Sequence, residues 1–146
     1  MRQFVTADTA GNEAAAEALV LPLGDGTPYC ELATDSYAIT DSVRVESSVV
    51  HGDTAIVVVA YHVLGHAWSE DSQKVGSRAG RFRAEDQMES VTFYVVRAST
   101  GRLGIDCDHR IPPNHPSVAH ATGWLRNLDP ASAVAWDSVS SRSASH

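Results

Sequence analysis

Residues 54–68 read TAIVVVAYHVLGHAW, and this stretch decides the fold. Its apolar side chains occupy odd and even positions alike, which is typical of a central β-strand covered on both faces. Its longest uninterrupted apolar run, at 55–60, is about a third of the roughly 18 residues that a membrane span needs. The stretch therefore predicts the middle strand of a sheet, and no membrane partner is expected.

The segments on either side of this strand continue the sheet. Residues 37–50 alternate with a period of two, which predicts a strand with one buried face. That face is expected to carry the odd-numbered residues Tyr37, Ile39, Val43, Val45 and Val49. Further along, 87–98 and 102–110 predict two strands joined by a loop at 99–101, in which a glycine supplies the positive φ. The polar residues at 69–81 are expected to form a mobile connection.

Helical sequence flanks the strands at both ends. Residues 2–21 are expected to form two short helices, which a Gly-Asn pair at 11–12 separates. A second helical stretch, at 116–128, follows two prolines, and a short helix is expected from Pro130 to about residue 139. The order of helices, antiparallel strands and helices predicts one α+β domain at 1–139, with a flexible tail at 140–146.

Composition and charge narrow the possible partners. The net charge of −7 argues against nucleic acid, whose binding depends on Lys and Arg neutralising phosphates. No basic segment precedes an apolar one at the start of the chain, so a cytoplasmic protein is expected, with an exported parent whose signal was trimmed left open. Cys30 and Cys107 form no Cys-x-x-Cys pattern, and both two free thiols and one disulfide remain open.

Four stretches resemble the nuclear transport factor 2-like superfamily, which includes ketosteroid isomerase and SnoaL-like polyketide cyclases. They are FVTADTAGN at 4–12, VHGDTAIVVV at 50–59, VTFYVVRASTGRLGI at 91–105, and a proline-plus-helix stretch at 112–128. Leu103 departs from the pattern, since members often carry an aromatic residue there. The resemblance implies a cone-shaped, strongly curved, mostly antiparallel sheet wrapped around N-terminal helices, a cystatin-like α+β roll.

The resemblance leaves the activity open. The conical pocket of this family supports isomerases, cyclases, dehydratases and hydrolases, and also members without any chemistry. It implies a small, largely apolar metabolite as the ligand. Because members often pair through the outer face of the sheet, a homodimer is expected as well. The chain carries no phosphate-binding loop, nucleophile elbow, or nicotinamide or flavin motif, so no cofactor is expected.

Three residues are candidates for moving a proton. Asp35 has the parity of the buried face and resembles, in place, the acidic base of ketosteroid isomerase; burial in an apolar cone would raise the pKa of its carboxyl. The alternative is a turn in which this carboxylate accepts from its own backbone. His109 is expected to point inward from the last strand, with Asp108 as the second choice there, and a rim histidine bonded to backbone is the alternative. His62 is the third candidate, on a strand whose orientation is ambiguous.

Aromatic residues are the candidates for lining a pocket, and ordinary core packing is the alternative for each. The predicted substrate-binding residues are Tyr37, Tyr61, Trp68, Phe93 and Asp108. No metal site is expected: His62 and His66 lie in a strand, where four residues span about 13 Å, whereas zinc holds each ligand at about 2 Å. Two hypotheses follow, a cofactor-independent acid–base enzyme and a non-catalytic ligand-binding or dimeric interaction module.

Overall fold

The structure, a computed structural model, describes residues 1–21, 36–69, 80–106, 115–125 and 127–143. Cys30 and Cys107 lie outside these ranges. The elements are α1 (Arg2–Thr9), α2 (Glu13–Glu17), β1 (Val20–Leu21), β2 (Ser36–His51), β3 (Thr54–Ser69), β4 (Gly80–Arg97), β5 (Leu103–Asp106), α3 (Val118–Trp124) and α4 (Pro130–Ser143). The strands form one sheet in the order β1-β5-β4-β3-β2, in which β1 and β5 are parallel and the other pairs antiparallel. The predicted α+β class is confirmed.

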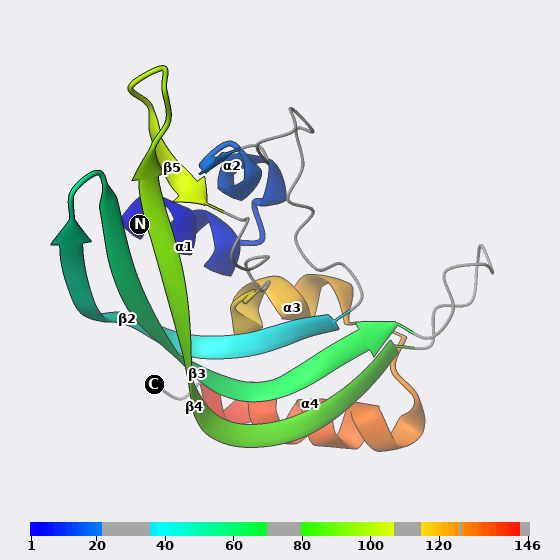
Figure 1. Cartoon of the computed structure of the whole chain (residues 1–146). Coiled ribbons are helices and arrows are strands. Elements are labelled where there is room, and N and C mark those ends of the chain that lie inside the picture. Colours follow the sequence, from blue (N-terminus) through cyan, green and yellow to red (C-terminus); the bar gives the residue numbers. More distant parts are fainter. Residues whose placement is uncertain (22–35, 70–79, 107–114, 126, 144–146) are drawn as a thin grey trace.

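The long strands β2, β3 and β4 bend sharply, and the helices pack around the bend (Figure 1). α1 and α2 lie inside the angle of the sheet, α3 lies beside β2, and α4 runs along β4 on the other side. One core cluster joins α1 and α2 to β3 and β4, and its members include Phe4, Val59, Tyr61, Val91 and Phe93. We call the face of the sheet that carries these strand residues the inner face.

The opposite, outer face is covered by a second core cluster at the far end of the sheet. Phe82 packs edge to face on Trp136 of α4, with ring centroids 5.2 Å apart. The backbone N–H of Phe82 donates to the hydroxyl of Ser132, at 2.9 Å. The cluster consists of Ile39, Ala67, Phe82, Val118, Ala121, Leu125, Trp136 and Val139. The two clusters together hold the sheet from both sides, each over a different half.

A β-bulge at Leu64 causes this exchange of faces. Ile39 and Thr40 are adjacent in β2, yet they pair with Gly65 and Val63, so β3 has one residue more than β2 at this point. Directly paired residues share a face of the sheet, and adjacent residues of one strand lie on opposite faces. Odd-numbered residues of β3 therefore lie on the inner face before the bulge and on the outer face after it.

The prediction of one buried face along β2 is wrong for the same reason, because further register shifts follow after Ile39. Tyr37 packs against the second cluster, on the outer face. Val43 pairs with Tyr61 on the inner face, and Val49 is back on the outer face, where it is 50% exposed. Counting odd and even positions takes no account of an inserted residue. It therefore assigns the side chains that follow a bulge to the wrong face.

Two segments are longer than predicted. β4 begins at Gly80, where the sequence is polar, because the chain at 127–129 supplies its missing edge partner. Gly80 N–H donates to the carbonyl of Asn127 at 2.8 Å, and Asp129 N–H donates to the carbonyl of Gly80 at 3.2 Å. α4 continues to Ser143, past the predicted end near Val139, whose side chain is 1% exposed. Within the described ranges, no helix is long and apolar enough to span a membrane.

Candidate active site

Three titratable side chains meet in the interior, at the inner face of the sheet. Asp8 of α1 is 2% exposed, Tyr61 of β3 is 0% exposed, and His115, which precedes α3, is 0% exposed. We call them the Asp8–Tyr61–His115 cluster. Asp8 is buried because it shares one face of α1 with Phe4 and Ala7, at the i, i+3 and i+4 positions of a helix.

The backbone holds the cluster in place. The N–H of His115 donates to Oδ1 of Asp8 at 3.0 Å. Two residues later, the N–H of Ser117 donates to the carbonyl of Thr9 at 2.8 Å, so the segment before α3 is attached to the end of α1. Tyr61 enters from the sheet, and its ring stacks on the imidazole of His115 with centroids 3.7 Å apart and an interplanar angle of 8°.

The polar atoms of the cluster are poorly satisfied. Nδ1 of His115 lies 3.6 Å from Oδ2 of Asp8, within ion-pair reach. Yet Oδ2 of Asp8, the hydroxyl of Tyr61 and both ring nitrogens of His115 make no hydrogen bond within the described part of the chain. Each buried unpartnered group costs about 1–3 kcal/mol. Such unpartnered groups are unusual in a native core, and a catalytic role is one of the explanations for them.

Electrostatics keep Tyr61 in its phenol form. Burial, with the negative charges of Asp8 and Glu89 adding to it, raises the pKa of Tyr61 above its usual value. The hydroxyl therefore stays protonated at any ordinary pH and is available as a hydrogen-bond donor. A donor that is fixed in a dry interior can stabilise negative charge that develops on a bound oxygen.

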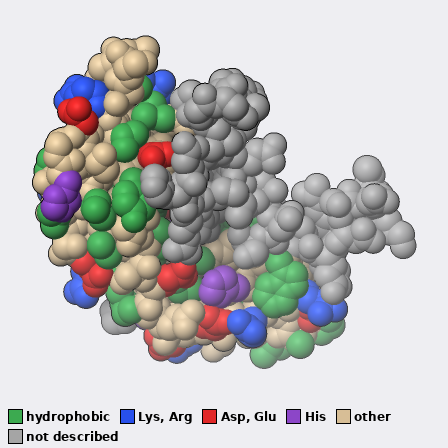
Figure 2. All heavy atoms as spheres, in the orientation of Figure 1, with side chains coloured by type: hydrophobic (Ala, Val, Ile, Leu, Met, Phe, Trp, Pro, Cys, Tyr) green, Lys and Arg blue, Asp and Glu red, His purple; other side chains and the backbone are tan. Residues whose placement is uncertain are grey.

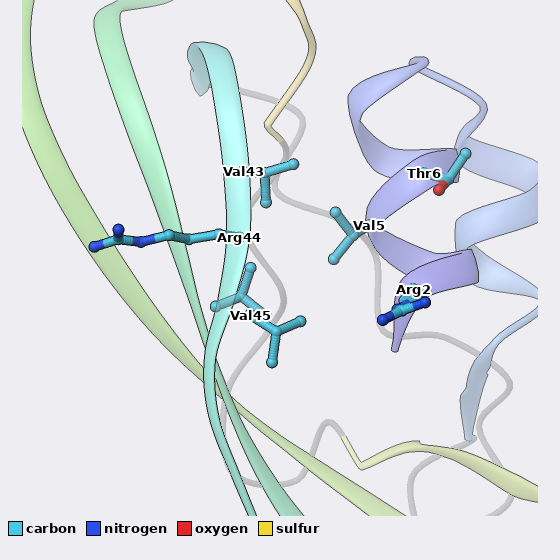
Figure 3. A pocket seen from close by; sticks show the side chains of 7 residues that line it. Arg2, Val5, Thr6, Val43, Arg44 and Val45 are labelled. Atoms are coloured by element: carbon cyan, nitrogen blue, oxygen red, sulfur yellow. The ribbon is translucent and has the colours of Figure 1, made fainter.

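A groove of about 360 Å³ lies on the same inner face, between α1 and β2. Its walls are Arg2, Val5, Thr6, Val43, Arg44, Val45 and Val59. In Figure 3, Val5 of α1 points toward Val43 of β2 across the groove, whereas Arg44 extends away from it. Val43 is the partner of Tyr61 in the sheet, although none of the three cluster side chains is itself a wall of the groove. The volume falls in the range usual for small-molecule sites.

Of the predicted catalytic residues, His62 alone lies within the described ranges, and it is not part of this cluster. Asp35, Asp108 and His109 lie outside the described residues. His62 lies on the outer face, opposite to Tyr61, where its Nδ1 is 2.8 Å from Asp41 and its Nε2 is 2.7 Å from Asp86. It links β2, β3 and β4 as a bridge between two carboxylates.

The predicted lining residues are divided between the two faces. Tyr61 belongs to the buried cluster, whereas Phe93 packs edge to face on Phe4, with centroids 5.5 Å apart, inside the first core cluster. Tyr37 packs on the outer face. Trp68 lies on the inner face by register, but about 20 Å of strand separates it from Tyr61.

The two histidines of the His-x-x-x-His pair point to opposite faces, because the bulge at Leu64 lies between them. His66 is on the inner face, with its Nδ1 3.2 Å from Oε2 of Glu85. His62 and His66 therefore cannot share one ion. Among the residues that the structure describes, no group of three or more His, Cys, Asp or Glu side chains could hold a metal.

We expect the outer bridge to make stability depend on pH. Hydrogen bonds to Asp86 and Asp41 raise the pKa of His62. The folded state then holds the proton more tightly than the unfolded state, so the stabilisation is complete below the unfolded pKa of about 6.5 and is lost as pH rises through the folded value. Urea denaturation at about pH 5.5 and pH 8.5 should show His62→Gln losing about 1 kcal/mol at the lower pH and little at the higher one. Equal losses at both values would contradict the bridge.

Sequence reasoning missed Asp8 and His115. A signal for Asp8 was present, since an acidic residue stood on the apolar stripe of a predicted helix. No signal marked His115, because it follows a stretch of irregular sequence and approaches Asp8 only through the fold.

No protein-family model matches the chain, and no curated protein matches its sequence.

Proposed function

We propose that this domain binds a small, largely apolar molecule on the inner face of its sheet and transfers a proton there without a cofactor. The Asp8–Tyr61–His115 cluster carries the proposal, because three titratable side chains are buried together with four unpartnered polar atoms. The adjoining groove provides apolar surface for the body of such a molecule. The bent sheet around α1 and α2 also supports membership of the nuclear transport factor 2-like superfamily, which we propose on the sequence resemblance.

The three side chains suit proton abstraction next to a carbonyl group. Tyr61 donates its hydroxyl hydrogen bond to the carbonyl oxygen, while a ring nitrogen of His115 takes the proton from the adjacent carbon. The electron pair of the broken C–H bond forms the carbon–carbon double bond of an enolate, whose charged oxygen Tyr61 stabilises. Asp8 stabilises the imidazolium through Nδ1 of His115, which lies 3.6 Å away. Return of the proton to the same or a conjugated carbon completes an exchange or an isomerisation.

Deuterium exchange tests the proposal without knowledge of the natural substrate. The chain is incubated in D₂O with a panel of alicyclic and aromatic ketones, and loss of the C–H signal next to the carbonyl is followed by NMR. We expect at least one ketone to exchange faster than in buffer. A panel that binds without any exchange would leave the alternative, a non-catalytic ligand-binding module.

A second observation favours self-association. Val49, Ile56 and Tyr94 form a cross-strand row on the outer face, in the half of the sheet that α4 does not reach. Val49 is 50% exposed, and Met88 on the same face is 54% exposed. Figure 2 shows hydrophobic side chains at the surface over the upper arms of β2, β3 and β4. Apolar surface of this kind is typical of an interface.

We therefore expect a homodimer that pairs through this row. Light scattering at micromolar concentration should give twice the chain mass, and Val49→Glu should lower it to the chain mass, because the charge would be buried in the interface. Val134 is also exposed, at 72%, but it lies on α4, so Val134→Glu is the matched control. A monomer mass for the unmodified chain would refute the dimer.

A further inference from the structure

The groove carries a positive charge at the end that lies away from the buried cluster. Arg2 stands at the start of α1 and Asp8 six residues later, which corresponds to about 9 Å along the helix axis. Across the groove, Val45 pairs with Val59, further from the cluster than Val43 is. In Figure 3, Arg2 lies at about the level of Val45, across the groove from it.

Arg2 has no partner of its own in the described part of the chain. Neither an ion pair nor a hydrogen bond joins its guanidinium to any described side chain. The chain as a whole has eighteen acidic and eleven basic residues, so an excess of positive charge does not explain an arginine that lies beside an apolar groove without a partner among the described residues. A guanidinium matches a carboxylate with two parallel hydrogen bonds.

The walls between Arg2 and the cluster are apolar. Val5, Val43, Val45 and Val59 line this length, and Val45 remains 47% exposed. An aliphatic or aromatic body would cover these side chains and gain about 25 cal/mol for each Å² of apolar surface removed from water. One end of the groove therefore attracts an anion and the middle attracts hydrocarbon, while the other end is formed by Val43, the sheet partner of Tyr61.

We infer that the ligand of this groove is a small amphipathic organic acid, whose carboxylate pairs with Arg2 while its apolar body lies against the valines. At its other end, about 9 Å away, such an acid would carry the carbonyl group on which the cluster acts. This last step rests on the proposed function, whereas the selection of an acid by Arg2 does not.

Hexanoate, octanoate and decanoate are the probes, with methyl octanoate as the uncharged equivalent of the second. Titration calorimetry measures affinity, and the methyl signals of valine in ¹³C NMR locate the binding. We expect octanoate to bind more tightly than its methyl ester and to shift the signals of Val43 and Val45. Arg2→Gln should weaken octanoate binding on the order of 10-fold and remove the preference for the acid, because a charge-assisted hydrogen bond is lost.

Arg142→Gln is the matched control. Arg142 lies near the end of α4, is not among the walls of the groove, and donates from its Nε to the carbonyl of Ser138 at 3.1 Å. Removing this charge should leave octanoate affinity unchanged. Equal losses in Arg2→Gln and Arg142→Gln would reduce the effect to general charge and overturn the inference, as would equal affinities for octanoate and its ester.

The two proposals can fail separately. Asp8→Asn should leave octanoate affinity unchanged while it lowers the rate of deuterium exchange. Arg2-dependent binding of octanoate without exchange of any ketone would uphold the acid site and refute the acid–base function. Deuterium exchange of neutral ketones, together with equal affinities for octanoate and its methyl ester, would uphold the acid–base function and refute the acid site.

Discussion

In Asp8→Asn, deuterium exchange into a bound ketone should fall by about 10²–10⁴-fold, the usual contribution of a positioned acid–base group. Asparagine keeps the Oδ1 acceptor for the N–H of His115, so the segment before α3 stays in place. The negative charge that faces Nδ1 of His115 at 3.6 Å is lost, and with it the stabilisation of the imidazolium. Exchange rates by NMR, measured with the most reactive ketone, give the result.

Measuring the free energy of unfolding of each variant distinguishes a loss of catalysis from a loss of folded protein. Tyr61→Phe removes a buried hydroxyl that has no hydrogen-bond partner in the described structure, and leaves the ring that stacks on His115. Its unfolding free energy should stay level or rise by about 1 kcal/mol. Its exchange rate should still fall by about 10²–10³-fold, since a donor to the enolate oxygen is gone.

Asp86→Asn is the control for charge removal, because Asp86 lies on the outer face beside His62. It should leave exchange unchanged. Wild-type exchange in both Asp8→Asn and Tyr61→Phe would refute the active site, and so would losses of exchange that follow losses of stability.

The core of the sheet could be predicted from sequence because it depends on composition over many residues. The apolar run of β3 and the hairpin glycine at 101 belong to the four predicted strands, and each of those stretches contains a strand, whereas β1, at Val20–Leu21, was expected to be helical. The faces could not be predicted beyond Ile39, since a single inserted residue near Leu64 reverses the alternation. The sequence around Leu64 contains no pattern that predicts such a bulge.

The candidate site was less predictable than the fold because contacts distant in sequence form it. Tyr61 was expected near a pocket, but its neighbours Asp8 and His115 come from opposite ends of the chain. A polar residue on the apolar stripe of α1 was the available signal, and it indicates a buried polar group without naming a partner. The candidates Asp35, Asp108 and His109 stay predictions, since they lie outside the described residues.

Gly65→Ala should destabilise the fold by about 2–3 kcal/mol, the cost of forcing extra volume into a packed interior. A Cβ at this position would lie 2.4 Å from the carbonyl oxygen of Arg83 and 2.5 Å from the ring of Phe82. The carbonyl belongs to β4, whose pairing with β3 continues on both sides of the contact, so it cannot move freely. Urea denaturation measures the change. Fluorescence should report it early, because Phe82 packs on Trp136.

Gly123→Ala is the matched substitution in the same half of the molecule. A Cβ there meets nothing within 4 Å, and the residue lies inside α3, so alanine should stabilise the fold by up to about 1 kcal/mol. Opposite signs for the two variants would show that close approach at Gly65, rather than loss of a glycine, sets the cost. If the urea midpoint of Gly65→Ala equalled that of the wild type, β4 would not approach β3 closely at this point. The register that assigns His66 and Trp68 to the inner face would then be wrong. Octanoate binding should survive in folded Gly65→Ala, since the groove lies in the other half of the sheet, on the near side of the bulge.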